Sequence, residues 1–372
     1  MPLLSKSDYL YQVRVYTAGG TAVAVYDDLT SLYYKKQVNH IGLAVLTVPD
    51  THPILDLIVD DLLLEIWFIS APPSGGSISD AQDFIGLYRD HQVATDGDGN
   101  TYYMLYFLGT LDILKRYIMA YPPGVNNKTS WVGARVDTIA ANIVDANCTA
   151  NATTANGRLR TATVIKGLTA TGGGLAAIVN YAASYRNVLE VLQTLADLGG
   201  FDFDILRPST ASINLTFSVY YPILGSDLHT TIIFDLNLDN VKTANLDGER
   251  LKENTVAIVG GAGEGAARAI SIRTGANYSA TNEYEIFVDA RNSASTELAA
   301  IGDAKLAELQ ARTNINVDIA PSSGYVYRRD YKLGDLVTAS FAGVMLTKKI
   351  STVEVKFDQD QNTTVRIELT DP

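Results

Sequence analysis

The sequence predicts a mainly β fold with smaller α/β insertions, which places the chain in the α+β class. Short runs of alternating apolar and polar residues, separated by turn residues, occupy the first 120 residues and the end of the chain. Helical patterns occur only between them. The chain has 372 residues, more than twice a typical ~150-residue domain, and 47% of them are apolar, so several cores can form. Strands do not alternate regularly with helices, which argues against a TIM barrel or a doubly wound sheet.

Residues 1–120 read as a strand-rich unit. Apolar residues alternate with polar ones from Tyr9 to Tyr16, and Gly19-Gly20 then predicts a hairpin turn. The segment Asp96–Asn100 is a second turn signal between two strand-like runs. Six or more short strands without a convincing helix predict a sandwich or a small barrel, because closure into a barrel is one way to cover exposed sheet edges.

Residues 121–200 have a different character, which begins at Pro122-Pro123. Asp137 can cap one short helix. A second helix follows Asn187, with Glu190 three residues later and Gly199-Gly200 as its end. Between them, 20 of the 28 residues from Thr149 to Ala176 are Ala, Thr, Gly or Asn. We expect this stretch to be mainly a mobile loop that proteases cut first, after Arg158 or Arg160.

Strands resume at Phe201 and dominate the end of the chain. The intervals 201–240 and 313–372 predict a second strand-rich unit, and 241–312 predict a mixed α/β insertion whose helix spans Ser295 to Arg312. The tail alternates strictly, with apolar residues at 353, 355, 357, 365, 367 and 369, so we expect a hairpin with one dry face and one wet face. Val365→Asp should therefore prevent folding, whereas loss of Thr370–Pro372 should be tolerated.

Composition excludes several classes of protein. The net charge is −12, which disfavours a sequence-reading nucleic-acid binder, since phosphate contacts need a basic surface. A single cysteine, Cys148, excludes a disulfide framework. No apolar stretch is long enough to span a bilayer, and the first residues do not resemble a signal peptide. We expect a soluble protein made inside the cell.

A glycine-rich segment is the strongest candidate for ligand binding. Gly261, Gly263 and Ala266 match the dinucleotide fingerprint G-x-G-x-x-A. That fingerprint requires a helix at the loop, and the residues after it, 269–273, look like a strand instead. We therefore interpret the segment as a loop between two strands.

The other candidate sites are weaker. Asp96, Asp98 and Asn100 have the spacing that opens a calcium loop, but Thr101 and Phe107 stand where glycine and a bidentate acid are required. The histidines are too dispersed for a metal motif; they are His40, His52, His91 and His229.

The acids Asp60, Asp61 and Glu65 are typical of a solvated edge beside a strand, and no nucleophile motif surrounds Cys148. We predict no catalytic residue, no cofactor site and no metal site.

Two stretches resemble a known protein family. One runs from Leu251 through the glycine loop to Val288-Asp-Ala-Arg291 and Gly302-Asp-Ala-Lys305; the other is Tyr331-Lys-Leu-Gly-Asp-Leu-Val337 with the hairpin after it. Both are similar to the tail-hub, or baseplate-hub, proteins of long-tailed bacteriophages of the siphophage type. The similarity covers most of residues 187–372.

The resemblance implies two antiparallel β-barrel hub domains, 1–120 and 201–240 with 313–372, plus the insertions 121–200 and 241–312. It implies a structural protein, not an enzyme, at the tip of the virion tail after assembly in the host cytoplasm. Three copies would form a pseudo-sixfold ring contacting the tail tube protein, the distal tail protein, a central fibre or spike and the tape measure protein. Phage DNA would pass without specific binding.

Two other functions stay open from the sequence. One is a carbohydrate- or receptor-binding module, which needs aromatic residues exposed in a cleft, and the other is a nucleotide-dependent enzyme. Residues 1–120 hold 14 acids and 7 basic residues. In a hub, some of these acids are expected to face the channel and repel DNA, although solubility alone also explains them.

Overall fold

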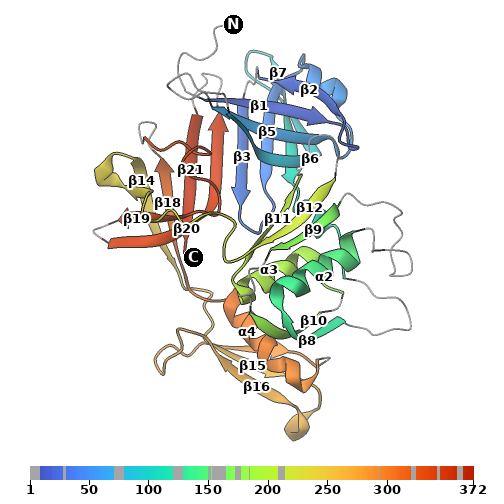
Figure 1. Cartoon of the computed structure of the whole chain (residues 1–372), viewed down its shortest axis with the longest axis vertical. Helices are drawn as coiled ribbons and strands as arrows, with labels where there is room; N and C mark the ends of the chain where they lie inside the picture. The colour runs from blue at the N-terminus through green and yellow to red at the C-terminus, as the bar shows by residue number, and fades with distance from the viewer. Residues whose placement is uncertain are drawn as a thin grey trace.

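The computed structural model describes the chain except for short gaps; the described residues are 9–27, 31–70, 79–119, 129–149, 152, 165–171, 177–183, 185–207, 214–291, 293–319, 324–341, 344–357 and 363–372. The fold is mainly β, as predicted, with helices concentrated in the middle of the chain (Figure 1). None of the described helices is long and apolar enough to cross a membrane.

One sheet of 13 described strands joins the two ends of the chain. Its strands from the first part of the chain are β1 (Tyr9–Tyr16), β2 (Ala22–Tyr26), β3 (Ser31–Gln37), β4 (Leu43–Pro49), β5 (Leu63–Ser70), β6 (Ser79–Thr95) and β7 (Thr101–Gly109). Those from the last part are β13 (Ile233–Asp235), β14 (Val241–Glu249), β18 (Arg312–Ile319), β19 (Leu336–Phe341), β20 (Val344–Phe357) and β21 (Thr363–Thr370).

The strand order corrects the expectation of two barrels. It runs β14-β18-β21-β20-β3-β4-β7-β6-β5-β1-β2, and within the described residues no sheet closes into a barrel. The two strand-rich parts meet where β20 pairs antiparallel with β3, from Thr352 opposite Gln37 to Phe357 opposite Leu32. Each part therefore covers an edge with a strand of the other part, which satisfies the same backbone groups that barrel closure would.

A single apolar core lies under this joint. It contains Tyr34 and Leu46 from the first part and Val353 and Ile367 from the last part, all at most 1% exposed. The tail hairpin is confirmed: β20 and β21 pair antiparallel, and their apolar residues at 353, 355, 367 and 369 are buried. Val365 is only half-buried, so it is a weaker core position than its alternation predicted.

A second unit lies beside the first part of the large sheet. It contains α1 (Asp112–Lys115), β8 (Thr129–Arg135), α2 (Val136–Cys148), β9 (Ile165–Thr171), β10 (Ile178–Ala183), α3 (Val188–Gly199), β11 (Asp202–Leu206) and β12 (Leu215–Tyr220). The predicted limits of α3 are confirmed. The Asn187 side chain accepts a hydrogen bond from the Leu189 amide, and Gly200 ends the helix at φ 61°, which glycine adopts without strain.

The small-residue stretch 149–176 is not wholly a loop, because β9 lies within it. Residues 165–171 pair parallel with β12, so this part is held by a backbone ladder. The predicted cleavage sites, Arg158 and Arg160, lie outside the described residues.

The third unit is a three-stranded sheet with a helix on one face. It contains β15 (Val256–Gly260), β16 (Ile270–Thr274), β17 (Glu285–Asp289) and α4 (Leu298–Glu308), and its strand order is β16-β15-β17. The helix was predicted to reach Arg312, but it ends at Glu308, because Arg312 already begins β18 and pairs with Glu249.

The division into four domains stays a prediction. Strands β11 and β12 pair with each other and with β9 in the second unit, although 201–240 was grouped with the end of the chain. Strand β14 pairs with β18 in the large sheet, although 241–312 was expected to be a separate insertion.

Candidate functional site at the junctions of the fold

The glycine-rich segment joins two strands, as predicted. After β15 the chain makes a 3-10 turn at Gly265–Ala267 and returns in the antiparallel strand β16. The Gly261 amide donates to the Ala269 carbonyl at 2.8 Å, and the Arg268 guanidinium donates to the carbonyls of Gly260 and Gly261. No helix begins at this loop, so it does not aim helix N-terminal amides at a pyrophosphate.

The calcium-like segment is a hairpin turn. One oxygen of the Asp96 carboxylate accepts the amides of Asp98 and Asn100, each at 2.9 Å, and Gly99 has φ 85°. These contacts stabilise the turn between β6 and β7 with the residues that turns prefer. Within the described residues, no three His, Cys, Asp or Glu side chains gather in a way that could hold a metal ion.

The four histidines lie in different environments. His52 caps a short 3-10 helix, Pro53–Leu57, and His91 stacks between Tyr88 and Tyr103. His40 contacts the Val38 carbonyl and His229 contacts the Asp227 carboxylate. Cys148 is buried at the end of α2.

The acids beside β5 do not stay together, and the solvated-edge interpretation is wrong for Glu65. Its side chain is 0% exposed and lies 2.6 Å from the guanidinium of Arg207, which is also 0% exposed. Trp67 Nε1 donates to the same carboxylate at 2.8 Å, and Arg207 donates to the Gly20 carbonyl at 2.9 Å. This buried ion pair ties the β1–β2 hairpin and β5 to the segment after β11.

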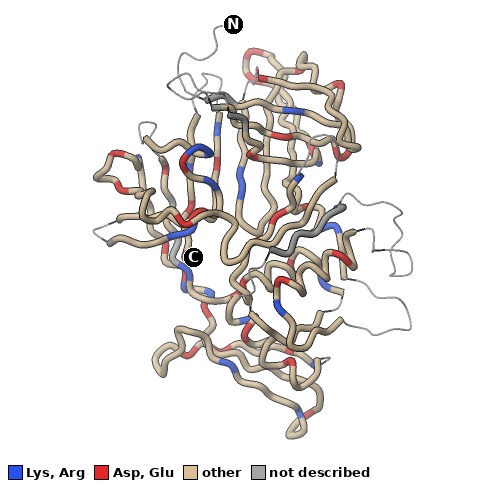
Figure 2. The backbone as a smooth tube through the Cα atoms, in the orientation of Figure 1, with Lys and Arg blue, Asp and Glu red and all other residues tan. Residues whose placement is uncertain are grey.

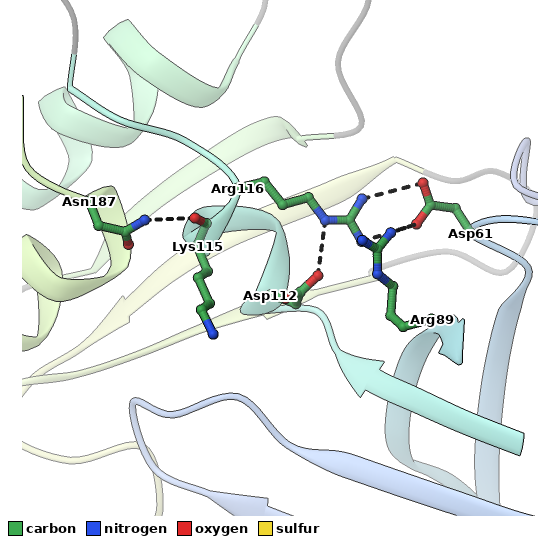
Figure 3. Close-up of polar contacts among 6 residues, drawn as sticks. All are labelled: Asp61, Arg89, Asp112, Lys115, Arg116 and Asn187. Carbon is green, nitrogen blue, oxygen red and sulfur yellow. Dashed lines mark hydrogen bonds and ion pairs between the residues drawn. The ribbon is translucent and has the colours of Figure 1, made fainter. Parts of the chain in front are cut away.

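Asp61 lies in a half-exposed network at another junction (Figure 3). Its carboxylate lies 3.2 Å from the Arg89 guanidinium and 3.0 Å from that of Arg116, which also contacts Asp112 at 2.9 Å. At Lys115, the residue next to Arg116, the carbonyl accepts a hydrogen bond from the Asn187 side chain at 2.6 Å. The network joins β6 and α1 to the start of α3, so it is structural.

A buried carboxylate, Asp83, lies where the first and last parts of the chain meet. It accepts the hydroxyls of Tyr34 at 2.5 Å and Tyr327 at 2.9 Å, and the Lys36 ammonium lies 2.9 Å away. Burial by itself raises the pKa of Asp83, but Lys36, Arg328 and the Tyr34 hydroxyl outweigh it and hold the pKa below its ordinary value. Burial and the Asp83 charge raise the pKa of Tyr34 and Tyr327 well above the ordinary tyrosine value, so both stay hydrogen-bond donors.

A cavity of about 300 Å³ opens beside Asp83, where the second unit meets both parts of the large sheet. Lys36, His40, Asp204, Tyr220 and Arg328 are among the residues that line it. Burial raises the pKa of Asp204 to about 6, only partly offset by Lys36. The Asp204 carboxylate therefore changes charge near neutral pH inside a joint between units.

Eight consecutive strands of the large sheet form an antiparallel array, β6-β7-β4-β3-β20-β21-β18-β14. One face of the array is the shared core. We call the opposite one the open face, since its side chains are half-buried or exposed; it includes Leu43, Val45 and Thr47 on β4 and Met104 and Tyr106 on β7.

Two ion pairs lie on the open face. Lys35 contacts Glu354 at 3.0 Å, and Arg366 contacts Asp318 at 3.3 Å. Strands β4 and β7 contribute no charged side chain to this face. Figure 2 shows that residues of both signs are interspersed along the described part of the chain.

Sequence reasoning missed the residues at the junctions. Asp83 and Tyr327 are 244 positions apart, and Glu65 and Arg207 are 142 apart, so no local spacing connects them. The available signal was a lone acid in an apolar strand, because a buried carboxylate needs a partner from elsewhere in the chain.

Residues 12–369 match the family model described as Siphovirus ReqiPepy6 Gp37-like protein. The chain belongs to this siphovirus tail-protein family. The resemblance to tail proteins of siphophages is therefore confirmed, and the chain is a structural protein of the phage tail. Among the curated proteins, none is similar enough in sequence to count as a match.

Solved structures share the fold of this Gp37-like protein over nearly its whole length. A tail protein from Neisseria meningitidis MC58 has a TM-score of 0.56 at 12% identity, covering 98% of this chain and 97% of its own. The 43 kDa tail protein of prophage MuSo2 from Shewanella oneidensis has a TM-score of 0.55 at 14% identity, covering 96% and 97%. The prophage tail protein gp18 from Listeria monocytogenes EGD-e has a TM-score of 0.52 at 10% identity, covering 98% and 94%. At these identities the likeness shows the fold alone.

Proposed function

We propose that three copies of this chain form a ring at the distal end of the tail, as a tail hub. The ring joins the tail tube and the distal tail ring to a central fibre or spike and leaves a passage for DNA. The observation that carries the proposal is the eight-strand array, which crosses from the first to the last part of the chain without a break. One chain thus supplies two strand-rich parts side by side, so three chains present six such parts to a sixfold tube.

Two features of the open face support this role, its ion pairs Lys35–Glu354 and Arg366–Asp318 and the uncharged strands β4 and β7. A lysine or arginine that is already paired with a carboxylate offers little free charge to a phosphate, so DNA slides past instead of sticking. The uncharged surface of β4 and β7 has the same effect. That some acids of residues 1–120 face the channel stays a prediction. Three of them are not available for that role, since Glu65 and Asp83 are buried in ion pairs and Asp61 is held between two arginines.

The location that follows is the tip of the virion tail, reached after assembly in the host cytoplasm. The partners are the tail tube protein, the distal tail protein, a central fibre or spike and the tape measure protein. No enzymatic step is part of this proposal.

A carbohydrate- or receptor-binding module and a nucleotide-dependent enzyme are the alternatives. A thermal-shift screen with glycans and nucleotides tests both, since a ligand of the folded state raises the melting temperature.

The mass of the purified chain in solution tests the ring. We expect sedimentation at increasing concentration to show a species of three times the 40.2 kDa of one chain, and electron microscopy to show rings with an open centre. A species that stays monomeric at every concentration, or a closed dimer, contradicts the proposal. Tight binding of the ring to DNA contradicts the proposal that DNA passes without binding, but it does not contradict the proposal of a three-chain ring.

A further inference from the structure

The cavity of about 300 Å³ beside Asp83 has no part in the hub proposed above. Its wall comes from three regions of the fold: β3, β6 and the end of β7 in the first part of the chain, β11 and β12 in the second unit, and the loop before β19 in the last part. Its volume is at the small end of the range for sites that hold small molecules. A small molecule bound there would contact all three regions at once.

The charges of the lining favour an anion. Among the described residues that line the cavity, Lys36, Arg328 and Lys332 are cationic, and Asp83 and Asp204 are acidic. Lys36 and Arg328 lie close together, because they contact the same Asp83 oxygen at 2.9 Å and 3.4 Å. The lining therefore carries an excess of positive charge, which grows when Asp204 takes up a proton. A carboxylate or phosphate group balances that excess, and both bind arginine and lysine through charge-assisted hydrogen bonds.

Two of these cations have donors to spare. Arg328 has φ 71°, a left-handed conformation that bulky residues rarely adopt, and such strain is typical of ligand-binding positions. One terminal nitrogen of its guanidinium donates to the Gln82 carbonyl at 3.0 Å, but its Nε is buried and donates no hydrogen bond to a described residue. Lys332 is exposed, and its ammonium makes no ion pair or hydrogen bond with a described residue. Both side chains can therefore bind a further acceptor in the cavity.

The rest of the wall is largely apolar and aromatic. It includes Phe84 on β6, Phe203 on β11, Tyr220 on β12, and Leu224 and Leu333 from the two loops. An inorganic ion gains little from such a wall, whereas a molecule with an apolar or aromatic body removes both surfaces from water. The wall therefore favours an organic anion over a bare ion.

We propose that this cavity binds a small organic anion, with its carboxylate or phosphate group held by Lys36, Arg328 and Lys332 and its apolar body against Phe84 and Phe203. The inference goes beyond the proposed function, because a tail hub needs no small ligand. It also does not depend on the ring, since one chain supplies all of these residues. A ligand at this position would tie the second unit to both parts of the large sheet.

Asp204 gives the site a pH dependence. Burial raises the pKa of Asp204 to about 6, so its carboxylate is charged at pH 7.5, where it repels a bound anion, and is largely neutral at pH 5.5. The other charged or titratable groups that line the cavity are Lys36, His40, Asp83, Tyr220, Arg328 and Lys332. Protonation of His40 over the same range also favours an anion, so a variant of Asp204 is needed to separate the two effects.

Titration calorimetry of the full chain at pH 7.5 tests the proposal with four probes. Phenyl phosphate and benzoate are the two organic anions, inorganic phosphate has the charge without the body, and benzyl alcohol has the body without the charge. We expect at least one organic anion to bind at one site per chain, about tenfold or more tightly than inorganic phosphate and benzyl alcohol. The organic anion that binds more tightly shows whether the site prefers a phosphate ester or a carboxylic acid. Binding of neither, or equal binding of benzyl alcohol, overturns the inference.

Three variants place the anion in the cavity. Lys332→Met is expected to weaken its binding about tenfold, because one charge-assisted hydrogen bond is lost. The matched control Lys252→Met removes an exposed lysine outside the cavity and should leave the affinity unchanged. Asp204→Asn should bind the anion more tightly than the unchanged chain at pH 7.5, and this difference should nearly vanish at pH 5.5.

The outcomes separate this inference from the hub. Equal effects of the two lysine variants, or no effect of Asp204→Asn at pH 7.5, would show that the anion binds elsewhere and overturn the inference. A trimer whose cavity stays empty rejects the ligand but keeps the ring. A chain that binds the anion and stays monomeric keeps the ligand but rejects the ring.

Discussion

The guanidinium of Arg207 lies 2.6 Å from the carboxylate of Glu65, and neither side chain is exposed to solvent. The pair fixes the segment after β11 to β5, and Arg207 also lies 4.2 Å above the ring of Tyr16. A charge left alone at this depth is costly, whereas loss of both charges is tolerated far better.

We expect Arg207→Met to lower the free energy of unfolding by about 3–5 kcal/mol, because it leaves the buried Glu65 carboxylate without a counter-charge. The double variant Glu65→Leu with Arg207→Met is expected to recover at least half of that loss. Urea unfolding followed by tryptophan fluorescence measures both. A double variant as unstable as the single one would show that the packing of the two side chains, and not their charges, stabilises the folded chain.

The Asp83 cluster predicts a graded series at the joint between the first and last parts of the chain. Tyr327→Phe removes one hydrogen bond from a carboxylate that keeps its other partners, so we expect a loss of about 1–2 kcal/mol. Asp83→Asn leaves Lys36 and Arg328 without a counter-charge, and a loss of about 3–5 kcal/mol is expected. Chemical denaturation gives both values. Equal losses would refute a cluster centred on the Asp83 charge.

Asp204 predicts a pH dependence of opposite sign to that of Asp83. Burial raises its pKa from 3.8 to about 6 in the folded chain, so the folded state takes up the proton first and gains stability as the pH falls from 7 towards 4. Asp204→Asn removes the cost of the buried charge and is expected to add about 2 kcal/mol at pH 7 and almost nothing at pH 4.

The measurement for Asp204 is the unfolding midpoint of both proteins at pH 4, 5, 6 and 7. Asp83, whose folded pKa is lowered, contributes stability that is lost only as the pH falls below about 4, so the two groups separate in pH. A difference between Asp204→Asn and the unchanged chain that does not vary from pH 7 to pH 4 would contradict the raised pKa.

The tail hairpin gives a position-specific test of the core. Ile367 is 1% exposed, whereas Val365 is half-buried at the rim. We therefore expect Ile367→Asp to abolish soluble, folded protein and Val365→Asp to give a folded but weakened one. Circular dichroism of the soluble fraction separates the two outcomes. If Val365→Asp is the more damaging change, the pairing register of β20 and β21 is wrong.

The last residues make contacts that the sequence did not predict. Lys348 is 3% exposed, and its ammonium lies 2.5 Å from the carboxylate of Asp371, while Thr370 pairs with Lys349. We expect removal of Thr370–Pro372 to cost about 1–2 kcal/mol, and Lys348→Met in the shortened chain to recover part of it. Thermal unfolding of the three proteins is the measurement, and an unchanged melting temperature after truncation would restore the first expectation.

Local patterns predicted what local physics decides. The cap at Asn187, the turn at Asp96 and the alternation in the tail each depend on residues within a few positions of one another, and all three are present. The joints could not be predicted, because their partners lie far apart in the chain. Alternation predicted one buried face for β20, but it predicted neither β3 nor the pairing of β3 with β20; two closed barrels satisfied the same pattern. The exposure of Glu65 was misjudged for the same reason, since its partner Arg207 has no signal near β5.

The pairing of β3 with β20 also has a consequence for biosynthesis. Leu32 lies opposite Phe357, so the ribosome must add about 320 further residues before β3 meets its partner. At roughly 5–20 residues per second this takes about 16–65 seconds, during which one edge of β3 stays open on the nascent chain. The large sheet can therefore be completed only near the end of synthesis. Until then, the open edge of β3 can pair wrongly with neighbouring nascent chains on the same messenger RNA. Slowing translation between the codons for β3 and β20 should lower the soluble yield more than slowing it before the codons for β3.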